Sequence, residues 1–162
     1  MPAVVKGARP VVLAALASFG LAVPVVAQGG PKPAPDPEIL QTVQRLFDAM
    51  RARDTVALRA VIDSSARVVT TTTREGRPVM RVASIDRFVA SVGTATQSLD
   101  ERIFEPDVRQ DDNLATVWTR YTFYVGTQLS HCGYDAFQLF RSEAGWKVIH
   151  IADTQRREGC AP

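Results

Sequence analysis

The C-terminal part of this chain is a nearly unbroken succession of strand-forming segments joined by tight turns. Residues 99–110, 114–125, 128–141 and 146–154 are rich in β-branched and aromatic side chains, and short polar or glycine-containing turns separate them. The turn at Gly126-Thr127 has only two residues. Because connections this short join antiparallel neighbours, the sequence predicts an antiparallel meander whose apolar face needs a second layer to cover it.

Segments with helical periodicity precede the meander and can provide that layer. Asp36, Asp54 and Ser84 are placed to cap three helices, and the first helix carries an apolar stripe formed by Ile39, Leu40, Val43, Leu46, Phe47 and Met50. Residues 66–74 and 77–82 flank a Glu75-Gly76 turn, which predicts a β-hairpin before the third helix. This order of elements predicts one α+β domain.

The first 27 residues have the composition of a secretory signal peptide. Lys6 and Arg9 precede an apolar stretch over 11–23, and small residues at 25 and 27 predict cleavage between Ala27 and Gln28. The apolar stretch is shorter than the roughly 20 residues of a spanning helix, so no membrane attachment is expected after cleavage. We therefore predict a signal peptide at 1–27, a Pro/Gly linker at 28–37, a folded domain at 38–162, and a secreted or periplasmic protein.

The chain has two cysteines, Cys132 and Cys160. In an oxidising compartment such a pair can close, so we predict a disulfide between them; the competing interpretation is two unpaired thiols with Cys160 in a loose tail.

Several classes of function lack the residues they require. A net charge of +2, with no cluster of Lys and Arg among aromatic residues, argues against nucleic acid as a partner. The two histidines lack the spacing of a zinc site, and there is no nucleophile elbow or phosphate-binding glycine loop. We therefore predict neither a metal nor a cofactor.

Strand alternation assigns side chains to the two faces of the meander. With uninterrupted pairing across Gly126-Thr127 and across a loop at 142–145, one face carries Trp118, Arg120, Tyr124, His131, Asp135, Phe137, Val148 and His150. The opposite face then carries Tyr121, Phe123, Cys132, Tyr134, Gln138, Ile149, Ile151 and Asp153. A single bulge would exchange the faces beyond it.

The first of these faces offers the aromatic walls and convergent polar groups of a ligand pocket. On this assignment His131 and Asp135 are the catalytic candidates, as general acid or base, and Arg120 or Tyr124 is the donor to an oxyanion. The predicted ligand pocket consists of Trp118, Arg120, Tyr124, Phe137 and His150. The competing interpretation makes His150 a wall residue and Asp135–Arg120 a structural ion pair across strands.

Two stretches of the C-terminal region, SHCGYDAFQLFR at 130–141 and GWKVIHIADT at 145–154, followed by RREGC at 156–160, resemble the nuclear transport factor 2-like (SnoaL-like) superfamily, and within it the group labelled lumazine-binding. The resemblance implies a cystatin-like cone, in which a curved antiparallel sheet wraps around three N-terminal helices. Many relatives are homodimers, so a homodimer is expected here.

The resemblance leaves three functional hypotheses open, because this fold hosts unrelated activities. The leading hypothesis is an exported domain that binds a small apolar or aromatic molecule. The second is a cofactor-independent isomerase, cyclase or dehydratase that uses an Asp or His in its pocket. The third is a non-catalytic dimerisation or association module whose pocket is filled by its own side chains.

Overall fold

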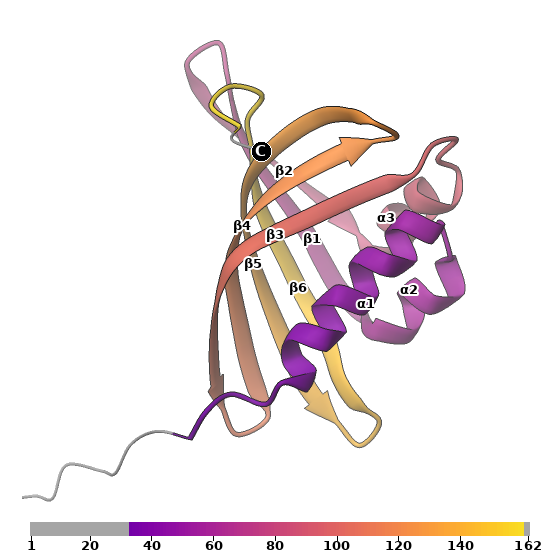
Figure 1. The fold of residues 1–162 in the computed structure, drawn as a ribbon, viewed down its shortest axis with the longest axis vertical. Helices are drawn as coiled ribbons and strands as arrows, with labels where there is room; N and C mark the ends of the chain where they lie inside the picture. Colours follow the sequence, from indigo (N-terminus) through magenta and orange to yellow (C-terminus); the bar gives the residue numbers. More distant parts are fainter. Residues whose placement is uncertain (1–32, 161–162) are drawn as a thin grey trace, which may run out of the picture. The chain divides into compact units, whose positions relative to one another are not determined.

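The computed structural model describes residues 33–160, so the predicted signal peptide lies outside the described residues. The chain runs through α1 (Glu38–Ala52), α2 (Thr55–Val61), β1 (Ile62–Arg74), β2 (Arg77–Ser84), α3 (Ile85–Gly93), β3 (Leu99–Asp111), β4 (Leu114–Val125), β5 (Gln128–Ser142) and β6 (Gly145–Gln155) (Figure 1). Within these residues, no helix is both long enough and apolar enough to cross a membrane.

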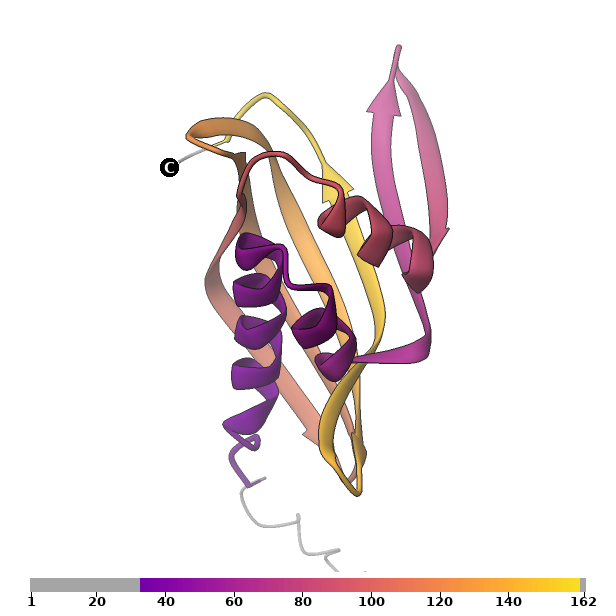
Figure 2. The same cartoon turned by 90° about the vertical axis from the view of Figure 1, so that its right-hand side faces the viewer.

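The six strands form one curved sheet in the order β2-β1-β6-β5-β4-β3. The three helices lie on the same side of this sheet, with α1 alongside β3 and β6 (Figures 1 and 2). This arrangement confirms the predicted α+β class and the meander from β3 to β6. The sheet is not purely antiparallel, however, because β1 pairs with β6 in parallel and thereby joins the hairpin to the end of the chain.

Two of the three helices begin with the capping residue that the sequence indicates, and the predicted cap of α1 is displaced by one residue. The carboxylate of Asp54 accepts hydrogen bonds from backbone N–H groups in the first turn of α2, and the hydroxyl of Ser84 accepts one from the first turn of α3. Asp36 lies one residue upstream of the α1 cap position, and its Oδ1 accepts from the backbone N–H of Glu38 at 2.9 Å. Its other oxygen accepts from Trp146 Nε1 at 3.2 Å, so the same carboxylate ties the start of α1 to β6.

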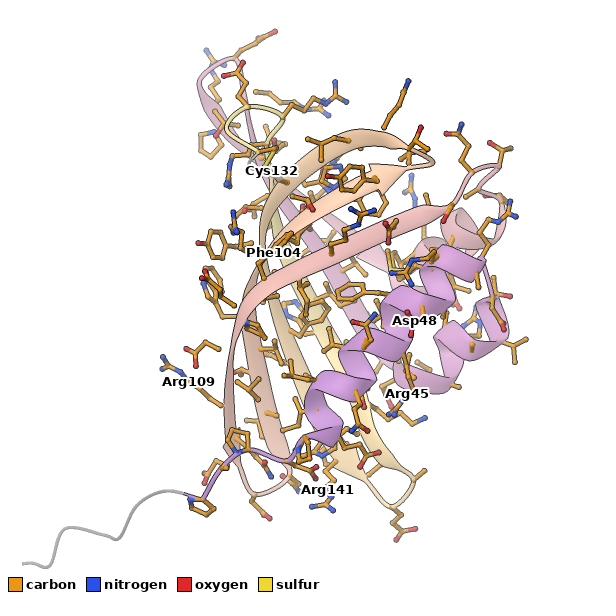
Figure 3. All side chains as sticks on the ribbon, viewed as in Figure 1. Arg45, Asp48, Phe104, Arg109, Cys132 and Arg141 are labelled. Atoms are coloured by element: carbon orange, nitrogen blue, oxygen red, sulfur yellow. A yellow bond between two sulfur atoms is a disulfide. The ribbon has the colours of Figure 1, made fainter. Side chains whose placement is uncertain are left out.

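The apolar stripe of α1 packs into the concave face of the sheet. Ile39, Val43 and Leu46 are fully buried there against the sheet residues Val117, Leu139, Trp146 and Val148. The rings of Phe47 and Phe137 meet edge to face with centroids 5.9 Å apart. Polar side chains of α1 such as Arg45 and Asp48 lie on its outward side, and Arg109 lies on the outer side of β3 (Figure 3).

Two β-bulges set which side chains face the helices. In the β4–β5 pair, Tyr124 faces Leu129 but Phe123 faces His131, so Ser130 is an extra residue. In the β5–β6 pair, Leu139 faces Val148 but Gln138 faces His150, so Ile149 is extra. Because each extra residue reverses the alternation beyond it, the uninterrupted register predicted from the sequence is wrong along part of each strand.

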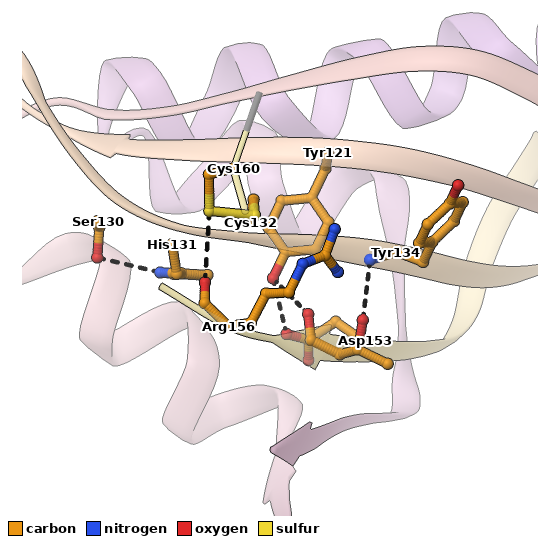
Figure 4. The surroundings of a disulfide bond; sticks show 9 residues. Tyr121, Ser130, His131, Cys132, Tyr134, Asp153, Arg156 and Cys160 are labelled. Atoms are coloured by element: carbon orange, nitrogen blue, oxygen red, sulfur yellow. Dashed lines mark hydrogen bonds between the residues drawn. A yellow bond between two sulfur atoms is a disulfide. The ribbon is translucent and has the colours of Figure 1, made fainter. Parts of the chain in front are cut away.

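The predicted disulfide between Cys132 and Cys160 is confirmed, with the two Cα atoms 5.6 Å apart. Cys132 is buried in β5, and its backbone exchanges hydrogen bonds of 2.9 and 3.0 Å with that of Arg156. The disulfide thus fastens the segment after β6 to β5, beside His131 and Tyr121 (Figure 4).

Candidate functional site

A cavity of about 280 Å³ lies between the helices and one end of the concave sheet face. Its helical wall is apolar, made mainly of Leu46, Phe47, Met50, Phe88 and Val92. Its sheet floor carries the charged and polar groups Glu101, Tyr121, His131, Asp135 and Asp153 beside apolar side chains. The volume lies near the lower end of the range for small-molecule sites, and an apolar wall with a few convergent polar groups is their usual composition.

Asp135 is the most deeply buried acid of this floor, with 2% of its surface exposed. Its Oδ2 has no hydrogen-bond partner among the described residues. Its direct partner on β6 is another acid, Asp153. Like charges directly opposite each other destabilise a sheet, and a buried carboxylate oxygen without a partner adds a desolvation penalty. This arrangement therefore serves no evident structural purpose.

Glu101, from β3, completes the acidic cluster. Burial and then the negative charge of Asp153 raise the pKa of Glu101 to about 7, although its hydrogen bond with Asp135 acts in the opposite direction. Burial and then the charge of Glu101 raise the pKa of Asp135 well above its ordinary value. Because such a hydrogen bond requires one protonated carboxyl, we infer that the pair retains a proton near neutral pH.

Tyr121 links the cluster to the end of β6. Its hydroxyl lies 3.2 Å from Asp153 Oδ2 and 3.0 Å from the backbone oxygen of Thr154, and can donate to either (Figure 4). Burial and the surrounding carboxylates raise the pKa of Tyr121, so it remains a neutral phenol and a hydrogen-bond donor. Gly133 makes this approach feasible, because a Cβ at that position would lie 1.8 Å from the Thr154 oxygen.

His131 forms the aromatic edge of the floor. Its ring lies 4.8 Å from the ring of Phe123 and 5.8 Å from that of Tyr121, measured between centroids. Its Nδ1 is 3.0 Å from the hydroxyl oxygen of Ser130, the bulge residue. Burial lowers the pKa of His131, with Asp153 opposing this and Arg157 reinforcing it, so the imidazole is neutral at pH 7.

The predicted site residues separate into two groups. His131, Asp135 and Phe137 line the cavity. The other four do not, because the bulges place them differently from the predicted register. Trp118 is 51% exposed and stacks on Tyr134, with ring centroids 5.3 Å apart.

The remaining three predicted pocket residues also have partners away from the cavity. The guanidinium carbon of Arg120 lies 4.7 Å from the centroid of Phe104, and that of Arg102 lies 4.6 Å from the centroid of Tyr124. His150 is half-buried and faces Gln138 on one neighbouring strand and Arg67 on the other. The alternative Asp135–Arg120 ion pair is not formed.

Sequence reasoning missed three polar members of the site, all of them on the sheet floor. Tyr121 and Asp153 were assigned to the opposite face, and Glu101 was not singled out at all. The available signal was Gly133, since a glycine within a strand pattern marks a bulge or a close backbone approach. It indicates an irregularity in β5 but not which residue is extra.

Among the described residues, no group of three or more His, Cys, Asp or Glu side chains has the geometry of a metal site. The cavity's own groups supply a shared proton on two carboxyls, a phenol donor and a neutral imidazole.

Solved structures with the same fold come from the nuclear transport factor 2-like superfamily. An NTF2-like protein with a cystatin-like fold from Novosphingobium aromaticivorans is 13% identical with a TM-score of 0.60, covering 76% of this chain and 82% of its own. A candidate dehydratase of the NTF2-like family from Streptomyces avermitilis is 14% identical, with a TM-score of 0.57. The match covers 74% of this chain and 94% of the Streptomyces chain. A protein of unknown function from Mycobacterium tuberculosis is 9% identical, with a TM-score of 0.60. The match covers 75% of this chain and 71% of the mycobacterial chain.

Identities at this level establish the fold and not the activity. No family model and no curated protein matches the sequence. The chain therefore has an NTF2-like, cystatin-like fold, as predicted.

Proposed function

We propose that this chain is a small-molecule-binding domain of the NTF2-like superfamily, whose ligand occupies the cavity beneath α1 and α3. The observation that carries the proposal is Asp135, a buried carboxyl with an unpartnered oxygen on the sheet floor of a cavity whose helical wall is apolar. A protein gains nothing in stability from such a group, whereas a ligand that bonds to it gains affinity and orientation.

Blocking the cavity entrance tests this proposal. Ser91 is exposed on α3 yet lines the cavity, so Ser91→Trp should fill the opening without disturbing the core. Ala90→Trp is the matched control, because Ala90 is exposed on the same helix and is not part of the lining. Ligand-observed NMR with a library of neutral and charged aromatic fragments should show binders that Ser91→Trp loses and Ala90→Trp keeps. Equal binding by wild type and Ser91→Trp would place the binding elsewhere and refute the proposal.

A second function, cofactor-independent proton transfer, is favoured by the pKa of Glu101, which is about 7. A general base is most effective when its pKa lies near the working pH. In this scheme Glu101 accepts a proton from a carbon next to a carbonyl group. The protonated Asp135 and the Tyr121 phenol then donate hydrogen bonds to the resulting enolate oxygen. His131, the other predicted acid or base, lies within the same cavity. The class of reaction is that of an isomerase, cyclase or dehydratase.

Exchange of carbon-bound hydrogen for deuterium tests the catalytic scheme. With 2-tetralone as the probe in D2O, the wild type should accelerate exchange next to the carbonyl, and Glu101→Gln should abolish the acceleration. Glu143→Gln, at an exposed turn position, should leave the rate unchanged. A rate in Glu101→Gln equal to that of the wild type would exclude Glu101 as the base.

Export is proposed as well, supported by a closed disulfide, which is typical of oxidising compartments. N-terminal sequencing of the exported protein should begin at Gln28.

Membership of the lumazine-binding group rests on the resemblance of the C-terminal stretches. It would be supported by binding of lumazine to the wild type but not to Ser91→Trp.

The homodimer stays a prediction. Light scattering at micromolar concentration should give twice the subunit mass. A monomer would contradict both the homodimer and the association-module hypothesis.

A further inference from the structure

All the formally charged side chains that line the cavity are acidic. Glu101 comes from β3, Asp135 from β5 and Asp153 from β6. The other elements around the cavity contribute no charge: α1, α3 and β1 line it with apolar side chains, Ser91 and Thr70. Within residues 33–160, no Lys or Arg belongs to the lining, and His131 is neutral there.

Nearby cations are engaged elsewhere instead of neutralising this cluster. Arg51 and Arg102 both bind Asp100, the neighbour of Glu101, at 2.8 Å. Arg157 does not line the cavity; its charge helps to lower the pKa of His131. Buried acids in proteins are normally paired with a cation, so the missing counter-charge is the most unusual property of this site.

We propose that the ligand of this cavity is an organic cation: a primary amine, protonated, on a small aromatic or aliphatic body. The inference rests on the proposed function and specifies its ligand class. An ammonium group has three donors and no acceptor, which matches three carboxyl groups from three strands. One of these donors would satisfy the unpartnered oxygen of Asp135. The apolar body would lie against α1 and α3, beside Phe123 and Phe137, whose aromatic rings can also attract a cation.

Other ligand chemistries fit these groups less well. An anion would meet three acids and no cation. A metal ion would need ligand geometry that these side chains do not form. A neutral molecule could accept a hydrogen bond from the protonated pair, but it would bring no positive charge to a cavity lined by three acids.

Binding of a cation should release protons from the site. The titratable groups that face the ammonium position are Glu101, Asp135, Asp153, Tyr121 and His131, with Arg157 close to His131. Below the pKa of Glu101, about 7, the amine must displace the shared proton; above it, a carboxylate is already ionised. Affinity should therefore rise with pH up to about 7, by up to about tenfold per pH unit for one displaced proton, and level off above it until the amine itself loses its charge.

Calorimetric titration with matched probes tests the proposal. The probes are benzylamine, 2-phenylethylamine and cyclohexylmethylamine, each paired with the alcohol of the same shape, and benzoate as the anion. At pH 7.5 the best amine should bind at least about tenfold more tightly than its alcohol, and benzoate should not bind. Asp135→Asn should remove this preference, and Asp153→Asn should reduce it less, because Asp153 already accepts from Tyr121. Asp107→Asn, an exposed acid at β3 paired with Arg109, should retain it.

Each outcome distinguishes this inference from the function on which it rests. If an alcohol binds as tightly as its amine, and Ser91→Trp blocks both, small-molecule binding stands and the cation inference fails. If no probe binds at millimolar concentration, both fail. Titration in phosphate and in Tris should additionally show about one proton released per amine bound at pH 6.5. Uptake of a proton would overturn the inference even if the amine bound.

Discussion

The two ends of the concave sheet face are built from the same strands but have opposite character. At one end β4, β5 and β6 present Val117, Leu139 and Val148, each at most 1% exposed, to the N-terminal half of α1. At the other end β5 and β6 present Asp135 and Asp153, and a cavity replaces close packing. One fold thus holds a dry apolar end and an acidic open end within a single sheet.

This difference indicates which end stabilises the domain and which end is available for function. Buried apolar side chains stabilise the folded state, whereas a cluster of acids destabilises it. The acidic end is instead held in place by the disulfide and by the bonds from Tyr121 to β6. Sites that bind or react commonly carry such a local penalty, which the rest of the fold offsets.

The largest effect is expected from a cavity at the apolar end. Leu139→Ala should lower the free energy of unfolding by about 4 kcal/mol, because Leu139 is fully buried and its truncation leaves a cavity in the core. Leu114→Ala, at a residue 49% exposed on the neighbouring strand, should change it by under about 0.5 kcal/mol. Urea unfolding measures both; equal losses would mean that the apolar end does not dominate stability.

Opening the disulfide should have the next largest effect. Cys132→Ser removes a link across 28 residues and should lower the free energy of unfolding by about 3 kcal/mol, through the entropy of the unfolded chain. Affinity for a cavity ligand at a temperature where the variant is folded should be unchanged, because neither cysteine lines the cavity. A melting temperature equal to that of the disulfide-intact protein would contradict this role.

Removing an acid should stabilise the acidic end, in contrast to both changes above. Glu101 has a pKa of about 7 in the folded protein and an ordinary value when unfolded. The unfolded chain therefore gives up this proton first, and stability falls as pH rises from about 4.5 to about 7. Glu101→Gln should raise the free energy of unfolding by about 2 kcal/mol at pH 8, less than the full pKa shift implies because Glu101 is only partly buried, and change it little at pH 4.

Thermal unfolding at the two pH values measures this difference. Glu143→Gln, at an exposed turn position, is the control and should show no pH-dependent gain. A Glu101→Gln variant less stable than wild type at pH 8 would mean that the carboxylate has a stabilising partner.

The smallest effect is expected from the phenol that joins Tyr121 to β6. Tyr121→Phe removes hydrogen bonds to Asp153 and Thr154 and should cost about 1 kcal/mol of stability. Tyr124→Phe is the matched control, since the Tyr124 ring contacts Arg102 and its hydroxyl has no such bonds to β6. Equal melting temperatures for the two variants would show that the link does not hold the acidic end.

Local patterns in the sequence determined much of this protein. The caps at Asp54 and Ser84, the stripe on α1, the hairpin turn at Glu75-Gly76 and the meander can each be derived from residues close together in the chain. The disulfide was also predictable, because the two cysteines of the sequence leave one pairing. These features depend on periodicity and turn chemistry, which act over a few residues.

Only the tertiary structure decided the composition of the site. The extra residues Ser130 and Ile149 turned Tyr121 and Asp153 inward and Arg120 away, and nothing in the local pattern identifies which residue of a strand is extra. The parallel pairing of β1 with β6 is equally non-local. Strand register is set by the packing of all the strands together, and a shift of one residue exchanges every side chain between the faces. The sequence therefore supplied the acids, and the pairing of strands distant in the chain brought them together.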